Sequence, residues 1–317
     1  MLFTPEVSHN RKNTPYHPVI FVLTTELTTQ TMKIILGRKG FDSIYGGVAS
    51  PIFEDGSMLS LPIPDPSNLT YDDLSVPCQS GVTFGMLVDD LTLGKIKHDE
   101  KVHLDPDLNP AMYPRKDGWL PLFGPSEKWQ SHLEDQKVTV EDLFLFFGWF
   151  RRVELQESGK YKFQKGEPDL HVIFGWLQVG EILHPTRNPG AIPEWAKYHP
   201  HCDNATDPEN NTVYVAKEKL GVNNQFPGGG VFRSYQENLR LTKPEQPKDH
   251  AKRSLWQLPE WFYPVSGKPM LSCHSNKDRW SKENRHTILQ SLPRGQEFVF
   301  DTTDYPEAIG WVESLFK

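Results

Sequence analysis

The chain has 317 residues, of which 37% are hydrophobic and 12% aromatic, and it carries a net charge of −7. This composition supplies a sizeable core and excludes a disordered chain, a collagen and a membrane bundle. The 27 Pro and 23 Gly predict a loop-rich protein with more sheet than helix.

The sequence also bears on the cellular compartment. The three cysteines, Cys78, Cys202 and Cys273, are far apart and form no Cys-x-x-Cys pair, so no zinc ribbon or disulfide framework is predicted. The longest early apolar run, residues 19–23, is too short for a signal-peptide core, and no stretch approaches the ~20 apolar residues of a membrane span. We expect a cytoplasmic protein with free thiols and no membrane association.

The first 31 residues differ in character from the rest of the chain. They combine a polar stretch with a threonine-rich one, whereas residues 32–36 read like the first strand of a domain. We expect 1–31 to be a poorly packed extension, with Met32 as the true or an alternative start, and 32–317 to form one domain.

The first half of that domain alternates short strands, turns and helices. The β-prone run 32–36 leads into a glycine-punctuated loop at 37–47, and an Asp-Gly pair at 55–56 predicts a hairpin turn. Apolar residues at helical spacing predict helices over 83–91 and 126–135.

The strongest pattern is a pair of long strands over 143–155 and 171–183. They contain near copies of one motif, FGWF and FGWL, whose glycines are Gly148 and Gly175. A glycine inside a strand usually marks a bulge or a barrel corner, so both positions predict strong curvature.

The last part of the chain completes the fold prediction. Strands are expected at 212–216 and 297–300 and after the glycines 228–230, and a closing amphipathic helix over 305–316. Strands and helices are interleaved without a regular βαβ rhythm. The predicted fold is therefore α+β and β-rich: a strongly curved mixed or antiparallel sheet, or a small barrel, with a few peripheral helices.

The loop after the first strand is one candidate site. Arg38, Lys39 and free backbone N–H groups at a strand end suit a phosphate, and Asp42 could orient a base or take a proton. The spacing matches neither a Walker loop nor GxGxxG, so a solvated turn is the alternative.

A second candidate is the pair His199 and His201, because imidazoles suit proton transfer or substrate contact near neutral pH. A metal site needs three or four converging ligands. The pair and its neighbours supply too few, so no metal is predicted, although the remote His103, His171 or His274 could complete a site. Structural loop histidines are the alternative.

Aromatic and basic side chains are the remaining candidates. Trp149 and Trp176 could form a wall on which a base stacks, with the core as the alternative, and Arg233 could clamp a phosphate. Residues 233–253 and 277–294 each carry more basic than acidic side chains, which would suit a polyanion. Such local differences in net charge also arise by chance.

Several stretches carry the pattern of one known family: residues 32–43, 46–47, 51–52, 60–64, 147–150, 171–176, 199–201 and 228–232. They resemble the nucleotide modification associated domain 3 family. The resemblance runs from about residue 32 to the C-terminus and leaves 1–31 outside. It implies a role in making or handling modified bases in bacterial or phage DNA, and it assigns no catalytic residue, reaction or cofactor.

These observations predict an enzyme or accessory factor that acts on a nucleotide or a DNA base. Arg38 and Lys39 would hold phosphate, the tryptophans would hold the base, and Asp42 or the pair His199 and His201 would move protons. The alternative is a non-catalytic module of PUA or ASCH type that binds modified bases or RNA. A structural subunit that depends on a partner is a third possibility. The cofactor and the protein partners are left open.

Overall fold

The computed structural model describes residues 31–125, 127–203, 209–247, 251–293 and 295–317. The chain divides into Met1–Gln30 and Thr31–Lys317, and all helices and strands named here belong to the second unit. The expected N-terminal extension, apart from residue 31, lies outside the described residues.

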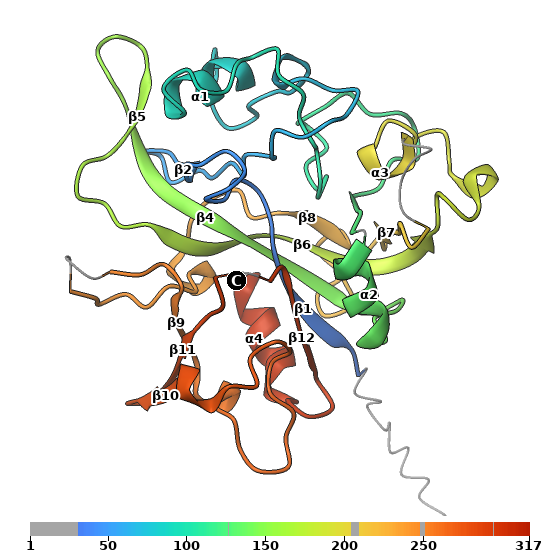
Figure 1. Cartoon of the computed structure of the whole chain (residues 1–317), viewed down its shortest axis with the longest axis vertical. Coiled ribbons are helices and arrows are strands. Elements are labelled where there is room, and N and C mark those ends of the chain that lie inside the picture. Colours follow the sequence, from blue (N-terminus) through green and yellow to red (C-terminus); the bar gives the residue numbers. More distant parts are fainter. Residues whose placement is uncertain (1–30, 126, 204–208, 248–250, 294) are drawn as a thin grey trace, which may run out of the picture. The chain divides into compact units, whose positions relative to one another are not determined.

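The centre of this unit is a mixed sheet of nine strands that curves into a half-barrel (Figure 1). Its main path runs in the order β12-β1-β4-β6-β7-β3. The bounds of these strands are β1 (Lys33–Arg38), β3 (Leu122–Phe123), β4 (Leu143–Leu155), β6 (Leu170–Leu183), β7 (Val213–Ala216) and β12 (Glu297–Asp301). Three short strands branch from it: β2 (Ser50–Ile52), β5 (Tyr161–Phe163) and β8 (Gly229–Val231). β1 and β2 run parallel to β4, and the other pairs are antiparallel.

The two long strands owe their length to burial on both faces. Residues 143–148 of β4 are all buried, so the strand reads as a continuous apolar run rather than an alternating one. The pairing register between β4 and β6 shifts by one residue after Phe146. Phe146 pairs with Gly175, but the next residue, Phe147, pairs with Ile173, so one residue of β6 is skipped. The predicted irregularity at Gly175 is therefore confirmed.

Gly148 serves a different purpose. It pairs with Val172 without a register shift, but a Cβ at this position would lie 2.9 Å from the carbonyl oxygen of Lys39. The glycine therefore lets the segment that follows β1 cross close to β4.

Within the described residues, a small antiparallel sheet and four helices complete the unit. The small sheet has the order β10-β11-β9, with β9 (Leu255–Pro259), β10 (Trp280–Glu283) and β11 (His286–Gln290). The helices are α1 (Phe84–Leu91), α2 (Glu127–Asp135), α3 (Pro200–Asp203) and α4 (Glu307–Leu315). Short 3-10 helices span Tyr71–Asp73, Pro189–Ala191, Glu237–Leu239, Glu260–Phe262 and Lys277–Arg279.

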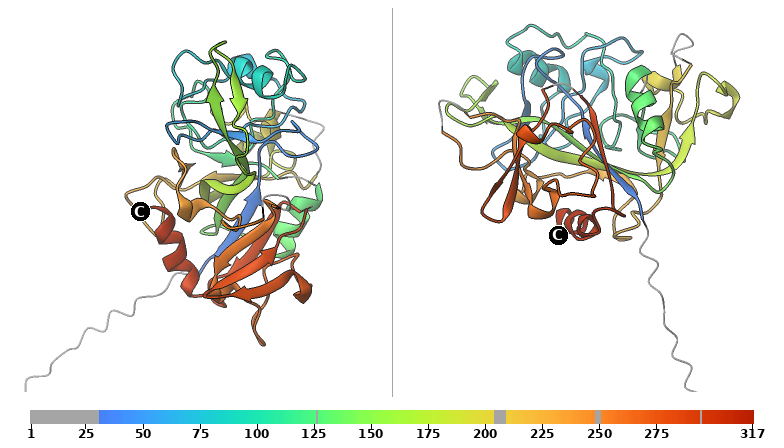
Figure 2. Two further views of the ribbon diagram at one scale, coloured as in Figure 1. Left: turned by 90° about the vertical axis from the view of Figure 1, so that its left-hand side faces the viewer. Right: turned by 60° about the horizontal axis from the view of Figure 1, so that its bottom comes forward.

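These elements cover the two sides of the central sheet. α1 and its loops lie on one side of β4 and β6, and the small sheet and α4 lie on the other (Figures 1 and 2). Phe147 packs against Trp256 of β9, with ring centroids 5.0 Å apart, whereas its neighbour Phe146 packs against Phe123 of β3 at 5.1 Å. The predicted β-rich α+β fold with a curved mixed sheet is confirmed. Among the helices of the described residues, none has the length and apolar character needed to span a bilayer.

Candidate functional site

The candidate site is a cluster of polar side chains from two loops that are far apart in the sequence. We call it the histidine–aspartate cluster, and its members are His103, Asp105, His199 and His201. The first two lie between α1 and β3, and the other two flank Pro200 at the start of α3. Nε2 of His103 is 3.2 Å from Nε2 of His201. Nε2 of His199 is 3.3 Å from Oδ1 of Asp105.

A buried ion pair holds the two loops against each other. Asp107 is completely buried and accepts hydrogen bonds from both terminal nitrogens of Arg115. The hydroxyl of Tyr198 donates to the same carboxylate. Because Asp107 comes two residues after Asp105, and Tyr198 directly precedes His199, this shared carboxylate keeps the members of the cluster in contact.

Three further hydrogen bonds orient the cluster. Nδ2 of Asn211 donates to the carbonyl oxygen of His201 at 2.7 Å. This fixes the orientation of the amide, so Oδ1 of Asn211 accepts a hydrogen bond from Nδ1–H of the His201 ring at 2.8 Å. The ring of His201 therefore presents an unprotonated Nε2 to His103. The backbone N–H of Gly124 donates to Oδ1 of Asp105 at 2.7 Å.

Burial and neighbouring charges set the ionisation of the cluster. Burial lowers the pKa of His103 to about 3 and also lowers the pKa of His201. Burial opposes a charge on His199 too, but the carboxylate of Asp105 and the thiol of Cys202 together outweigh it and raise the pKa of His199 to about 9. Although burial disfavours its ionised form, His199 and the other nearby cations hold the pKa of Asp105 well below its usual range. The cluster thus combines a carboxylate, one protonated imidazole and two neutral imidazoles.

Lys39 places a positive charge beside the cluster. Its Nζ lies 2.9 Å from Oε1 of Glu297, which is completely buried, and 4.3 Å from the ring centroid of Phe123. The charge of Lys39 acts on Asp105 and on His103. Of the candidate residues, the structure therefore brings Lys39 together with His199 and His201.

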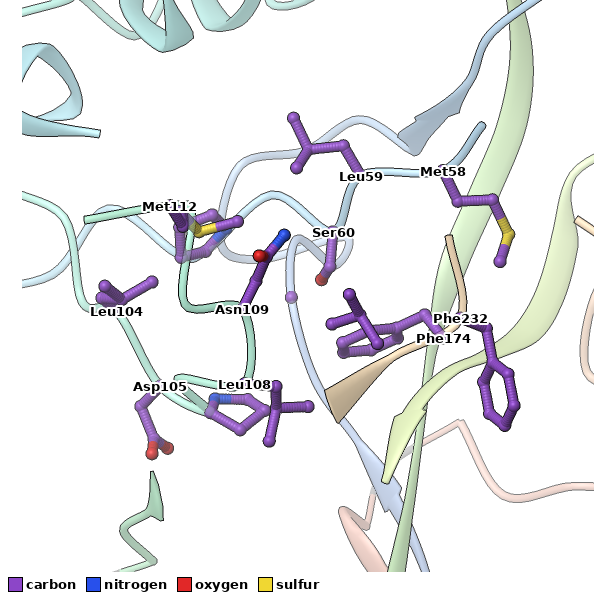
Figure 3. A pocket seen from close by; sticks show the side chains of 14 residues that line it. Met58, Leu59, Ser60, Leu104, Asp105, Leu108, Asn109, Met112, Phe174 and Phe232 are labelled. Carbon is purple, nitrogen blue, oxygen red and sulfur yellow. The ribbon is translucent and has the colours of Figure 1, made fainter. Parts of the chain in front are cut away.

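An apolar cavity of about 40 Å³ adjoins the cluster at Asp105. In Figure 3, Asp105 lies at one end of this cavity and Met58 and Phe232 lie at the other, with Ser60 and Asn109 between them. The volume has room for a water molecule but not for a base.

Arg38 belongs to a different site, because it and Lys39 are consecutive residues of an extended segment and point to opposite faces of the sheet. We call this site the arginine patch, and its members are Arg38, Arg253 and Trp149. Cζ of Arg253 lies 4.1 Å above the ring centroid of Trp149. Burial, followed by the charge of Arg253, lowers the pKa of Arg38 to about 10. Within the described residues, Nε of Arg38 and Nε1 of Trp149 are buried without a hydrogen-bond partner.

The remaining candidates lie elsewhere. Asp42 accepts hydrogen bonds from the backbone N–H groups of residues 44 and 45, and its charge acts on the arginine patch. Trp176 is buried, and its Nε1 donates to a backbone carbonyl at 3.0 Å. Arg233 is exposed. The structure therefore places none of these three in the cluster.

Sequence reasoning missed Asp105 and named His103 only as one of three remote histidines. The other two lie apart from the cluster: His171 accepts a hydrogen bond from Trp256, and His274 packs against Phe298. The pattern His-x-Asp at residues 103–105 is visible in the sequence. It forms a site only together with the loop that carries His199 and His201, and no local pattern shows that contact.

Three members of the cluster could hold a metal ion. One donor atom each from His103, Asp105 and His201 lie within 4.8 Å of one another, and this is the only such group of three found among the described residues.

A larger cavity of about 410 Å³ lies between β9, α4 and the segment 237–244. Acidic and basic residues both line it, among them Glu237, Glu260 and Arg285. Arg240 at its wall already donates to three backbone carbonyls. This cavity offers room but no convergent set of reactive groups, so the cluster is the better candidate.

Comparison with known proteins agrees with the family resemblance of the sequence. A family model described as nucleotide modification associated domain 3 matches residues 33–301, from β1 to the end of β12. The match includes every residue of the cluster and of the arginine patch. Comparison with curated proteins and with solved structures yields no match.

Proposed function

Because the chain belongs to the nucleotide modification associated domain 3 family, we propose that it is an enzyme or accessory factor acting on a nucleotide or a DNA base at the histidine–aspartate cluster. One observation carries the proposal. Two loops are held against each other although their facing residues, His103 and His201, are 98 positions apart in the sequence. As a result, four buried or half-buried polar side chains converge beside a cavity.

The groups that converge are chemically suited to this function. Imidazole and carboxylate are the side chains that enzymes use to move protons at a reacting centre or to hold a metal against it. His199 and His201 are the catalytic residues of the proposal, joined by His103 and Asp105. Lys39 is a positioning residue, since its charge favours the ionised carboxylate and its own ammonium is bound to Glu297.

The cavity beside Asp105 sets a condition on the substrate. At about 40 Å³ it is too small for a base, so binding requires one of the loops around it to move. Met58, Phe174 and Phe232 at the far side would then give the base an apolar contact.

The proposal is tested in the organism that carries the gene. A deletion strain is complemented with the wild-type chain, with His201→Ala, or with His286→Ala, which removes an exposed histidine of the larger cavity. DNA and the nucleotide pool are digested and compared by mass spectrometry. We expect a modified nucleoside with the wild type and with His286→Ala, and a loss of at least tenfold with His201→Ala. Equal levels with both variants, or a loss only with His286→Ala, would remove the cluster from the function.

The arginine patch favours a second function, the binding of a polyanion. The guanidinium of Arg253 lies over the indole of Trp149, and its charge acts on Arg38 from nearby; burial lowers the pKa of both arginines. This arrangement suits a phosphate next to a stacked base. With this function the chain would be a non-catalytic module that binds nucleic acid.

A salt series separates the two functions. Fluorescence anisotropy with a single-stranded oligonucleotide should show affinity that falls steeply with salt, and Arg253→Ala should reduce the slope by about one phosphate contact. Arg285→Ala, in the exposed turn between β10 and β11, is the matched control. Binding that does not depend on salt, or that Arg285→Ala weakens equally, would exclude the patch as a polyanion site.

A further inference from the structure

We propose that His103, Asp105 and His201 bind one divalent transition-metal ion, such as Fe(II) or Zn(II). The inference goes beyond the proposed function, which requires no metal, and it concerns the same cluster. Metal binding is measured directly, so the two proposals fail separately.

The distance between the two imidazoles fits a shared ion. Nε2 of His103 and Nε2 of His201 are 3.2 Å apart. Two nitrogen atoms each ~2.1 Å from one ion, at angles between octahedral and tetrahedral, are separated by ~2.9–3.4 Å. A single proton shared between two neutral rings is the other way to satisfy these nitrogens, and a metal titration separates the two.

The ring of His201 is oriented as the ring of a metal ligand would be. Its Nδ1–H is bound to Oδ1 of Asn211, and the amide is fixed in turn by its bond to the carbonyl oxygen of His201. Ligand histidines typically donate their second N–H to such a partner, which fixes the tautomer and the ring. The unprotonated Nε2 of His201 therefore points at the place where the ion would lie.

Asp105 supplies the third ligand. The contacts that the described residues make with its carboxylate, from Gly124 and His199, fall on Oδ1. Its Oδ2 is the oxygen available to an ion. Two imidazoles and one carboxylate favour a transition metal over Mg²⁺ or Ca²⁺, which prefer oxygen ligands.

Three protein ligands leave coordination positions for water or substrate. Asp105 also lines the apolar cavity, so these positions would lie next to the place where the substrate enters. Among the described residues, two unfavourable charges lie nearby. That of Lys39 is compensated by Glu297 at 2.9 Å, and that of His199 is paired with Oδ1 of Asp105 at 3.3 Å.

The test is a metal titration of the full chain, freed of any purification tag and stripped with a chelator. Anaerobic titration with Co(II) should give visible d–d bands that saturate at one ion per chain, and Zn(II) should displace it while Mg²⁺ should not. His103→Ala should weaken Co(II) binding by at least ~100-fold, and Asn211→Ala by ~10–100-fold. His286→Ala, the exposed control, should bind as the wild type does. His103→Gln replaces His103→Ala if circular dichroism shows that the latter does not fold.

Three results would overturn the inference: no d–d bands with the wild type, equal affinity in the wild type and in a folded His103 variant, or a loss of binding in His286→Ala. Metal binding without any modified nucleoside would remove the proposed function and leave the metal site. Activity that depends on His201, in a chain that binds no metal, would remove the metal site and leave the proposed function.

Discussion

Gly124 shows how closely the cluster is packed. Its backbone N–H donates to Asp105, and a Cβ at this position would lie 2.4 Å from the ring of His201. Real Cβ atoms do not approach a side chain so closely. Because the ring is itself held by Asn211, it has little freedom to move aside. The absence of a side chain at residue 124 is therefore part of the site.

Gly124→Ala tests this packing. We expect it to lower the free energy of unfolding by about 1–3 kcal/mol, as other overpacked cores do, and to weaken Co(II) binding by displacing His201. Urea unfolding and the Co(II) titration give the two values. Gly190→Ala is the matched control, because a Cβ there meets nothing within 4 Å. If both variants unfold at the same urea concentration, the ring of His201 is not confined in this way.

At the scale of elements, strands and helices with a strong apolar pattern could be predicted from the sequence. Both long strands, α1 and α4 agree with the patterns of apolar residues that predicted them. The small sheet could not be predicted in this way. Only one residue of β10, Trp280, is buried, and β9 ends at Pro259, so neither strand has the continuous apolar run of β4. These strands depend on tertiary contacts such as that between Trp256 and Phe147.

Replacing a glycine by alanine should have opposite effects on stability in α4 and in β6. Gly310 lies inside α4, is exposed, and a Cβ there meets nothing within 4 Å. Gly310→Ala should therefore raise the free energy of unfolding by about 0.5–1 kcal/mol. Gly175→Ala in β6 should lower it by more than about 1 kcal/mol, because its Cβ would lie 2.9 Å from a backbone oxygen of Gly230. Thermal unfolding of both variants measures these changes. A Gly175→Ala chain as stable as the wild type would show that β8 can move away from β6.

At the scale of the whole unit, the central sheet separates two sites. The cluster and Lys39 lie on the face that carries Phe146, and the arginine patch lies on the face that carries Phe147. The sequence predicted part of the cluster, through the closely spaced His199 and His201. It could not predict the rest, since the position of the other loop depends on the buried carboxylate of Asp107, which no local pattern marks.

The same separation explains why consecutive residues have different neighbours. Arg38 and Lys39 were expected to hold one phosphate together, but alternation along the extended chain sends them to opposite faces. The patch and the cluster lie on opposite sides of the sheet and share no hydrogen bond among the described residues. We therefore expect the effects of substitutions in them to be independent.

If the histidine–aspartate cluster acts on the nucleotide, Asp105→Asn should abolish the function. The substitution keeps the size of the side chain and removes its charge, and Asp117→Asn, at an exposed position, is the control. Both variants are expressed in the deletion strain, and the nucleosides of its DNA and nucleotide pool are measured by mass spectrometry. We expect Asp117→Asn to restore the modified nucleoside and a folded Asp105→Asn chain not to restore it. Full restoration by Asp105→Asn would show that the cluster does not act on the nucleotide.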